Sequence, residues 1–228
     1  MIKAVVFDLD HTLFDRHGTL REIAKQFRTY FSVREGVTDD EIAEKWIYAD
    51  DHFVYDGWEY IFAYLKENGI FENAPDFSEY RSFVYATFAE TAAAFPETKP
   101  MLAKLRKQGY KTALITNGRH SLQYKKLTML KLADCFDEII VSGDVMCSKP
   151  DREIFHLMCD KLSLAPEEMV YVGDNPVNDI DGARKAGYHT VWMKSTGMWN
   201  YGIDRAEAEV SRVEEVPAAI EEISRNIK

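Results

Sequence analysis

Two carboxylates follow a short apolar segment near the start of the chain. Residues 3–7 read KAVVF; Asp8 comes directly after them and Asp10 two positions later. A β-branched and aromatic run without polar alternation is typical of a strand buried on both faces of a parallel sheet. Ligands of open parallel sheets bind outside the carboxyl ends of the strands, so both carboxylates can face one cleft. One can then attack phosphorus while the other transfers a proton, although aspartate is also common in ordinary strand-terminal turns.

Polar groups also follow three further segments of this kind. Apolar runs recur at 112–116 (TALIT), 138–142 (EIIVS), 169–173 (MVYVG) and 189–193 (HTVWM). Thr116 and Asn117 end the first of these runs, and Lys149 follows the second after a short loop. Asp174 and Asp179 follow the third. A hydroxyl, an amide and a lysine suit phosphoryl oxygens, whereas carboxylates suit Mg²⁺, a hard cation that prefers oxygen ligands.

Each of these signals has an ordinary alternative. A strand-to-helix turn explains Thr116 and Asn117, an isolated lysine is usually solvated, and Asn178 or Asp179 can cap a following helix. Together, however, the strand ends deliver an acid pair, a hydroxyl, a lysine and a second acid cluster to the same edge of the sheet. Their combination therefore predicts a single site that handles a phosphate group with the help of a metal ion.

The elements that must position these residues alternate regularly in the second half of the chain. Helical patterns occupy 97–108, 120–131, 152–162 and 178–186, between the strand segments. Gly109 and Gly187 directly follow two of them, where a glycine commonly ends a helix. This alternation predicts an α/β fold with a doubly wound parallel sheet and right-handed crossovers.

Residues 14–96 interrupt this alternation, because they are too many for one crossover helix. Apolar residues recur there at helical spacing, and Thr38 followed by Glu41 forms a capping-box sequence. We therefore expect a helical insert at 14–96 between two parts of a catalytic core, 1–13 and 97–228. Most of the aromatic residues of the insert should form the core of its helical bundle.

Composition restricts the partners. The 228 residues carry a formal net charge of −10, which makes the chain a poor candidate for binding the phosphate backbone of nucleic acid. The apolar run at residues 4–7 is too short for a signal core or a membrane span. The three cysteines are an odd number without a CxxC pair, as expected for reduced thiols in the cytoplasm. We expect a cytoplasmic monomer or homodimer that binds neither nucleic acid nor membrane.

Four segments resemble the motifs of the haloacid dehalogenase-like (HAD) superfamily, and the resemblance covers essentially the whole chain. They read DLDHTLFD, ITNG, SKPDREIF and VGDNPVNDIDGARKAG, in the order of the family motifs. The resemblance implies a Rossmann-like core with a type-I helical cap. Within the superfamily, the sequence looks most similar to the nucleotidase and sugar-phosphatase branches. The third motif usually reads KPDP, and here Arg152 replaces the second proline. Because that position opens a helix, we expect little effect on the chemistry.

The resemblance also implies roles for the aspartates. It makes Asp8 the nucleophile and a metal ligand, and Asp10 the general acid/base, whose backbone carbonyl also faces the metal. Asp174 is the acidic metal ligand, and Mg²⁺ is the implied cofactor. Asp179 is a supporting acid that helps to hold Lys149 or metal-bound water.

The phosphate group has its own implied contacts. By the same resemblance, Thr116 and Asn117 contact the phosphoryl group and Lys149 stabilises it. The implied function is Mg²⁺-dependent hydrolysis of small-metabolite phosphate monoesters through an aspartyl-phosphate, with a nucleoside 5′-monophosphate or a sugar phosphate as substrate. On this expectation, cap aromatics such as Tyr55 and Trp58 select the leaving group.

Three alternatives stay open from the sequence. A haloacid dehalogenase needs no metal and would leave Asp10 and Asp174 without a purpose. A phosphomutase shares all four motifs, so the motifs cannot separate it from a phosphatase. A non-catalytic binding protein is disfavoured because Asp8 and Asp10 are both present.

Overall fold

The computed structural model describes residues 1–53, 57–195, 199 and 202–227. Contacts divide the chain into two compact units, which we call the sheet unit (Met1–Asp15 with Ala94–Lys228) and the helical unit (Arg16–Ala93). The sequence places the insert at 14–96. The assignment of this insert as a cap over a catalytic core stays a prediction.

The sheet unit is built on a parallel sheet, as the sequence predicts, with six strands in the order β5-β4-β1-β6-β7-β8. Five of these strands match the predicted segments, and β8 was not predicted. The strands are β1 (Ala4–Phe7), β4 (Lys111–Thr116), β5 (Glu138–Val141), β6 (Met169–Gly173), β7 (His189–Met193) and β8 (Ala208–Val210). In the register, Phe7 lies between Leu114 of β4 and Val172 of β6. The first strand therefore runs through the middle of the sheet, and Asp8 leaves it at the carboxyl edge.

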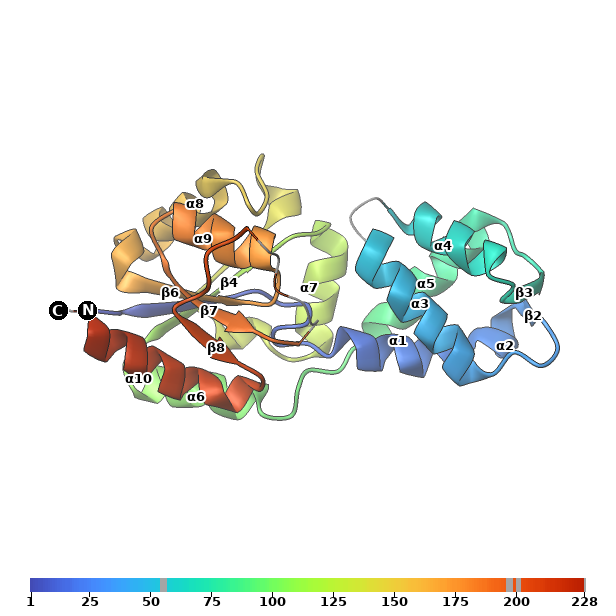
Figure 1. The fold of residues 1–228 in the computed structure, drawn as a ribbon, viewed down its shortest axis with the longest axis horizontal. Coiled ribbons are helices and arrows are strands. Elements are labelled where there is room, and N and C mark those ends of the chain that lie inside the picture. The colour runs from blue at the N-terminus through green and yellow to red at the C-terminus, as the bar shows by residue number, and fades with distance from the viewer. Residues whose placement is uncertain (54–56, 196–198, 200–201, 228) are drawn as a thin grey trace. The chain divides into compact units, whose positions relative to one another are not determined.

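Helices cover both faces of this sheet (Figure 1), which confirms the doubly wound architecture. On one face lie α6 (Thr98–Lys107) and α10 (Val216–Asn226), and on the other α8 (Arg152–Leu162) and α9 (Gly182–Lys185). Helix α7 (His120–Met129) connects β4 to β5. Short helical turns occupy Ala133–Cys135, Ser142–Asp144, Pro166–Glu168, Pro176–Asp181 and Val213–Glu215. As expected, Arg152 opens a helix.

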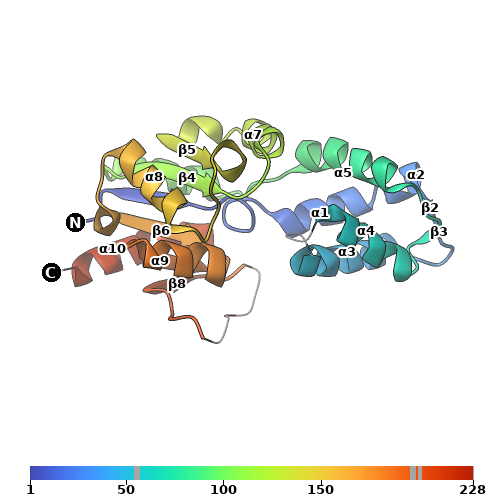
Figure 2. The ribbon, with the colours of Figure 1, turned by 90° about the horizontal axis from the view of Figure 1, so that it is seen from above.

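The helical unit is a bundle with a small hairpin beside α2 (Figure 2). Its helices are α1 (Arg16–Ala24), α2 (Phe27–Tyr30), α3 (Asp39–Phe53), α4 (Trp58–Glu67) and α5 (Phe77–Thr91). The hairpin pairs β2 (Ser32–Val33) with β3 (Phe71–Asn73). Thr38 caps α3 as predicted, because its hydroxyl accepts a hydrogen bond from the backbone N–H of Glu41 at 3.1 Å.

Aromatic rings fill the core of this bundle. Phe27 is fully buried at its centre. Its ring centroid lies 5.0–6.5 Å from those of Phe31, Trp46, Phe71, Tyr80 and Phe83. These six rings are core residues, as expected, whereas Tyr30, Tyr48 and Tyr60 are exposed, so the expectation that most aromatic residues of the insert are core residues is met only in part. Trp58 packs on Tyr85 with a centroid distance of 4.5 Å, and Tyr55 lies outside the described residues.

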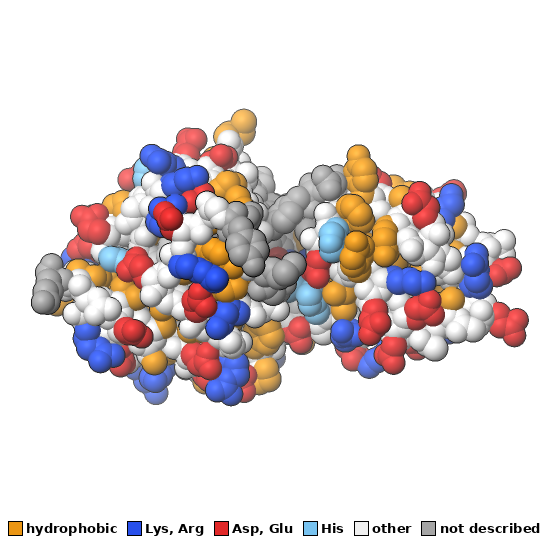
Figure 3. All heavy atoms as spheres, in the orientation of Figure 1, with side chains coloured by type: hydrophobic (Ala, Val, Ile, Leu, Met, Phe, Trp, Pro, Cys, Tyr) orange, Lys and Arg blue, Asp and Glu red, His pale blue; other side chains and the backbone are white. Residues whose placement is uncertain are grey.

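Charged side chains of both signs are mixed over the surface shown in Figure 3. The described part of that face of the sheet unit carries no continuous basic area. Among the residues that the structure describes, no helix combines the length and the apolar character needed to span a bilayer.

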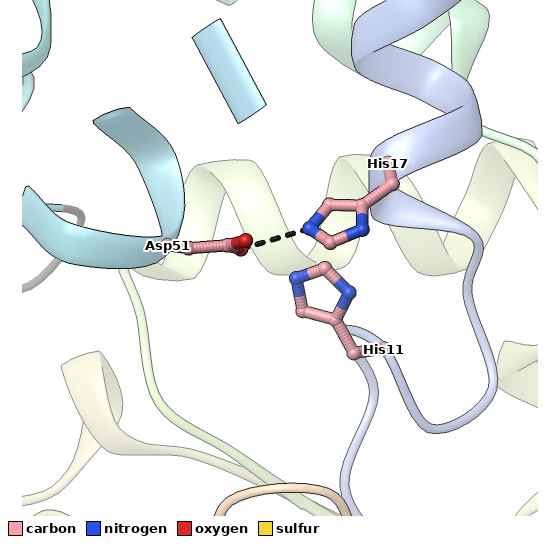
Figure 4. A group of neighbouring side chains, drawn as sticks. All are labelled: His11, His17 and Asp51. Atoms are coloured by element: carbon pink, nitrogen blue, oxygen red, sulfur yellow. Dashed lines mark hydrogen bonds and ion pairs between the residues drawn. The ribbon is translucent and has the colours of Figure 1, made fainter. Parts of the chain in front are cut away.

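Two neighbouring aspartates of α3 form very different ion pairs within the helical unit. Asp50 is 2% exposed and binds the buried Arg16 guanidinium through both oxygens, at 2.5 and 2.7 Å. Asp51 is exposed and lies 2.8 Å from Nε2 of His17 (Figure 4). The two positions therefore allow a matched comparison of a buried and an exposed ion pair.

We predict that Asp50→Asn lowers the free energy of unfolding by about 3 kcal/mol, because it leaves the buried Arg16 charge without its carboxylate. Asp51→Asn should change it by less than about 1 kcal/mol, since water screens the exposed pair. Urea titration of both variants and the wild type checks this difference. Equal losses for the two variants would contradict it.

Candidate active site

The first motif forms a tight loop at the carboxyl end of β1. The backbone N–H of Asp8 donates to the carbonyl of Val172 at 2.9 Å, so the pairing with β6 fixes this residue. Beyond it the chain turns back: His11 has a φ of 60°, and its N–H donates to the carbonyl of Phe14 at 3.0 Å. His11 thus shapes the loop that carries Asp10.

Lys149 lies at the centre of the site. Its Nζ donates to Oδ1 of Asp8 at 2.6 Å, to Oδ1 of Asp179 at 2.6 Å and to the hydroxyl of Tyr171 at 3.0 Å. The side chain is only 3% exposed. Burial by itself lowers the pKa of Lys149, but the charges of Asp179 and Asp8 outweigh it and hold the pKa well above its usual value. The lysine is therefore a permanent cation between two carboxylates.

For Asp8, the effect of burial on the pKa is larger than the effect of the ion pair with Lys149. Desolvation raises its pKa, Lys149 opposes this, and the charges of Asp179 and Asp10 raise it further, to about 7. Because the ammonium of Lys149 is shared, it compensates each carboxylate only in part. The site therefore favours binding of further positive charge close to Asp8.

Three buried carboxylates can supply that binding site. Oxygens of Asp8, Asp174 and Asp179 all lie within 4.8 Å of one another. Asp174 is fixed by its backbone carbonyl, which accepts from Nε1 of Trp192 at 2.7 Å. An all-oxygen donor set suits a hard divalent cation such as Mg²⁺, so these residues fit the implied metal. The predicted contribution of the Asp10 backbone carbonyl stays a prediction.

The turn of the fourth motif depends on Asn175. Its Oδ1 accepts backbone N–H bonds from Val177 and Asn178 at 3.0 and 2.9 Å and so caps the turn Pro176–Asp181. The suggestion that Asn178 or Asp179 caps this helix is therefore wrong. The reason is positional: Asn175 is the last residue before the turn, so its side chain can reach the free N–H groups.

Asp179 instead points to the site. Besides its bond to Lys149, its Oδ2 accepts from the backbone N–H of Asn175 at 2.9 Å. A Cβ at Gly173 would lie only 2.4 Å from Cγ of Asp179. The end of β6 therefore needs a glycine so that this carboxylate can lie against the backbone.

The second motif is tied to the third through Asn117. Its Oδ1 accepts from the backbone N–H of Lys149 at 2.9 Å, and its Nδ2 donates to the Lys149 carbonyl at 2.9 Å. The side-chain amide thus positions the loop that carries Lys149. The hydroxyl of Thr116 accepts from Nε2 of Gln123 at 2.5 Å. The predicted contacts of Thr116 and Asn117 with a phosphoryl group stay predictions.

Sequence reasoning missed three polar residues of the site. Lys126 and Gln123 of α7 both bond to the carboxylate of Asp10. The hydroxyl of Tyr171, besides accepting from Lys149, donates to the carbonyl of Ile115 at 3.0 Å. For Lys126 a signal was available, because it occupies the apolar side of the predicted helix 120–131. Nothing in the sequence marks Tyr171 as different from the apolar residues of its strand.

Comparison with known proteins identifies the family. The family model described as haloacid dehalogenase-like hydrolase matches residues 5–193. The chain belongs to this family. The superfamily resemblance read from the four motifs is thereby confirmed.

Curated relatives of the chain are phosphatases. Glyceraldehyde 3-phosphate phosphatase of Pyrococcus furiosus is 29% identical over 231 residues, which cover 98% of this chain and 94% of that protein. N-acylneuraminate-9-phosphatase of Rattus norvegicus is 29% identical, with 97% and 95% covered. Phosphoserine phosphatase of Thermus thermophilus is 42% identical over 99 residues, which span 43% of this chain and 40% of that protein.

Solved structures share the fold over nearly the whole chain. A HAD phosphatase from Thermococcus onnurineus has a TM-score of 0.65 at 26% identity, covering 96% of this chain and 98% of that one. L-2-haloacid dehalogenase from Xanthobacter autotrophicus has a TM-score of 0.75 at 20% identity, covering 97% and 99%. At that identity the second likeness concerns the fold alone.

The pKa of Asp8 predicts a pH-dependent stability of the metal-free protein. The pKa is about 7 in the folded chain, against 3.8 for an ordinary aspartate. This group therefore contributes stability that is present below about pH 4 and is lost as the pH rises through about 7. We expect Asp8→Asn to become progressively more stable than the wild type over this range, measured as the difference in Tm in chelator-treated buffer. A difference in Tm that does not change with pH would contradict the prediction.

Proposed function

We propose that this HAD-family hydrolase is a Mg²⁺-dependent phosphatase, which cleaves small-metabolite phosphate monoesters through an aspartyl-phosphate at Asp8. The observation that carries the proposal is the carboxylate cluster at the end of the central strand. There Asp8 shares the Lys149 ammonium with Asp179 and lies within 4.8 Å of Asp174 and Asp179. The phosphatase relatives support a phosphoric monoester hydrolase.

Attack of a carboxylate on a phosphate ester brings two anions together. Catalysis of such a transfer consists mostly of positioning and of neutralising the charge on the phosphoryl oxygens. Lys149 places one fixed positive charge next to the Asp8 oxygen. A bound Mg²⁺ would supply further charge neutralisation at the carboxylates of Asp8 and Asp174.

The proposed reaction has two steps. In the first, an oxygen of Asp8 bonds to phosphorus as the ester bond breaks, and Asp10 gives its proton to the departing alkoxide oxygen. In the second, Asp10 takes a proton from a water molecule whose oxygen attacks phosphorus, which frees Asp8 and inorganic phosphate. We assign contacts with the phosphoryl oxygens to Thr116, the last residue of β4, and to Asn117, which follows it at the same edge of the sheet.

The proposed substrate is a nucleoside 5′-monophosphate or a sugar phosphate. A panel should contain these two classes together with the substrates named for the relatives: glyceraldehyde 3-phosphate, phosphoserine and N-acylneuraminate 9-phosphate. Phosphate release identifies a phosphatase, whereas isomerisation of a sugar phosphate without release would identify a phosphomutase. Chloride release from 2-chloropropionate would identify a dehalogenase.

Removal of the metal should abolish activity. We predict that EDTA stops hydrolysis of p-nitrophenyl phosphate and that Mg²⁺ restores it. Because the cation binds only the folded site, Mg²⁺ should also raise the Tm of the wild type. This rise should be much smaller for Asp174→Asn, while the exposed Asp160→Asn should behave like the wild type. Full activity in metal-free buffer, with no change in Tm on adding Mg²⁺, would refute the metal site.

The two aspartates of the first motif should differ in their dependence on the leaving group. Asp8→Asn should reduce kcat by about three orders of magnitude or more on every substrate, because an amide cannot form the acyl-phosphate. Asp10→Asn should reduce kcat/KM for alkyl phosphates by about 10²–10⁴-fold. It should reduce it less for p-nitrophenyl phosphate, whose leaving group needs little protonation. A near wild-type rate for Asp8→Asn would remove it from the nucleophile role.

A further inference from the structure

Helix α7 holds a buried lysine against the Asp10 carboxylate. The Lys126 side chain is 1% exposed, and its Nζ donates to both oxygens of Asp10, at 2.7 and 2.8 Å. Its Nζ also lies 5.3 Å from the ring centroid of Phe14. Burying an ammonium group is costly unless it is paired and hydrogen-bonded. An apolar side chain would fill this place in the helix at no such cost, so the presence of the charge requires another explanation.

Gln123 supports the same carboxylate from one turn earlier on the helix, since residues three apart share a face. Its Nε2 lies 3.2 Å from Oδ2 of Asp10, 2.5 Å from Oγ1 of Thr116 and 3.1 Å from the carbonyl of Asn117. The amide therefore connects Asp10 to the end of β4. Together, the two side chains of α7 contact both oxygens of the carboxylate.

Asp10 needs such support because it lies beyond the end of β1 and outside the ladder that fixes Asp8. It is carried by the turn at His11, and its side chain is 21% exposed. The side chain of an aspartate on such a turn can adopt several rotamers. Proton transfer requires the one rotamer that directs a carboxylate oxygen at the leaving group.

We infer that Lys126 is a positioning residue for the reaction: it holds the Asp10 carboxylate in the orientation from which Asp10 transfers protons. The inference rests on the proposed function. Lys126 acts through Asp10 and has no part in the attack by Asp8. Its loss should therefore matter most for substrates whose leaving group must be protonated.

The test compares leaving groups in Lys126→Met, which keeps the length and removes the charge. We expect kcat/KM for an alkyl phosphate of the panel to fall by about 10²-fold, as for a misplaced catalytic group. The fall in kcat/KM for p-nitrophenyl phosphate should be smaller by a factor of about 10 or more. Lys125→Met is the matched control, because Lys125 is the exposed neighbour on the same helix. It should leave both values unchanged. Lys126→Arg should restore part of the alkyl phosphate activity.

A double variant separates positioning from a general structural effect. If Lys126 acts only through Asp10, adding Lys126→Met to Asp10→Asn should cost no further activity on either substrate. Equal losses of Lys126→Met on both substrates, or a further loss in the Asp10→Asn background, would overturn the inference. Should Lys126→Met fail to fold, as judged from its thermal transition, Lys126→Gln is measured by the same criteria.

Failure of the inference and failure of the proposed function give different results. A wild-type protein that releases no phosphate from any member of the panel with Mg²⁺ would overturn both. Normal wild-type activity with an unchanged leaving-group ratio in Lys126→Met would overturn the inference alone.

Discussion

The ammonium group of Lys149, shared between Asp8 and Asp179, is the interaction on which the site depends. It lets two buried carboxylates approach the same point without the full cost of their repulsion. Much of the surrounding structure keeps this ammonium in place. The side chain of Asn117, directly after β4, binds the backbone of Lys149, and the hydroxyl of Tyr171 in β6 binds its Nζ. Gly173 leaves room for the carboxylate of Asp179.

The parallel sheet is what brings these groups together. They belong to segments far apart in sequence, and the order β5-β4-β1-β6 places the ends of those strands side by side. This much was predictable, because strands buried on both faces have continuous apolar sequences and their carboxyl ends share one edge. The position of β1 between β4 and β6 explains why Asp8 is buried and why residues that follow β5 and β6 can reach it.

Other features could not be predicted for physical reasons. Strand β8 has three residues, of which only Val210 is buried, so it has no apolar run. The cap at Asn175 and the bonds of Asn117 to Lys149 depend on loop geometry, which residue types alone do not determine. Lys126 was visible in the sequence as a lysine on an apolar helix face. Its partner Asp10, however, lies 116 positions away and is brought near only by the sheet.

The two aspartates of the first motif are bonded to two different buried lysines. Lys149 bonds to Asp8, and Lys126 bonds to Asp10. Each lysine comes from a different crossover, so the environments of the two carboxylates can be set independently. Together with Asp174 and Asp179, these side chains form a set of four carboxylates and two ammonium groups. With all six ionised, the set carries two excess negative charges, which one divalent cation balances. Within this set, the raised pKa of Asp8 and the fit of the site to Mg²⁺ thus have the same electrostatic origin.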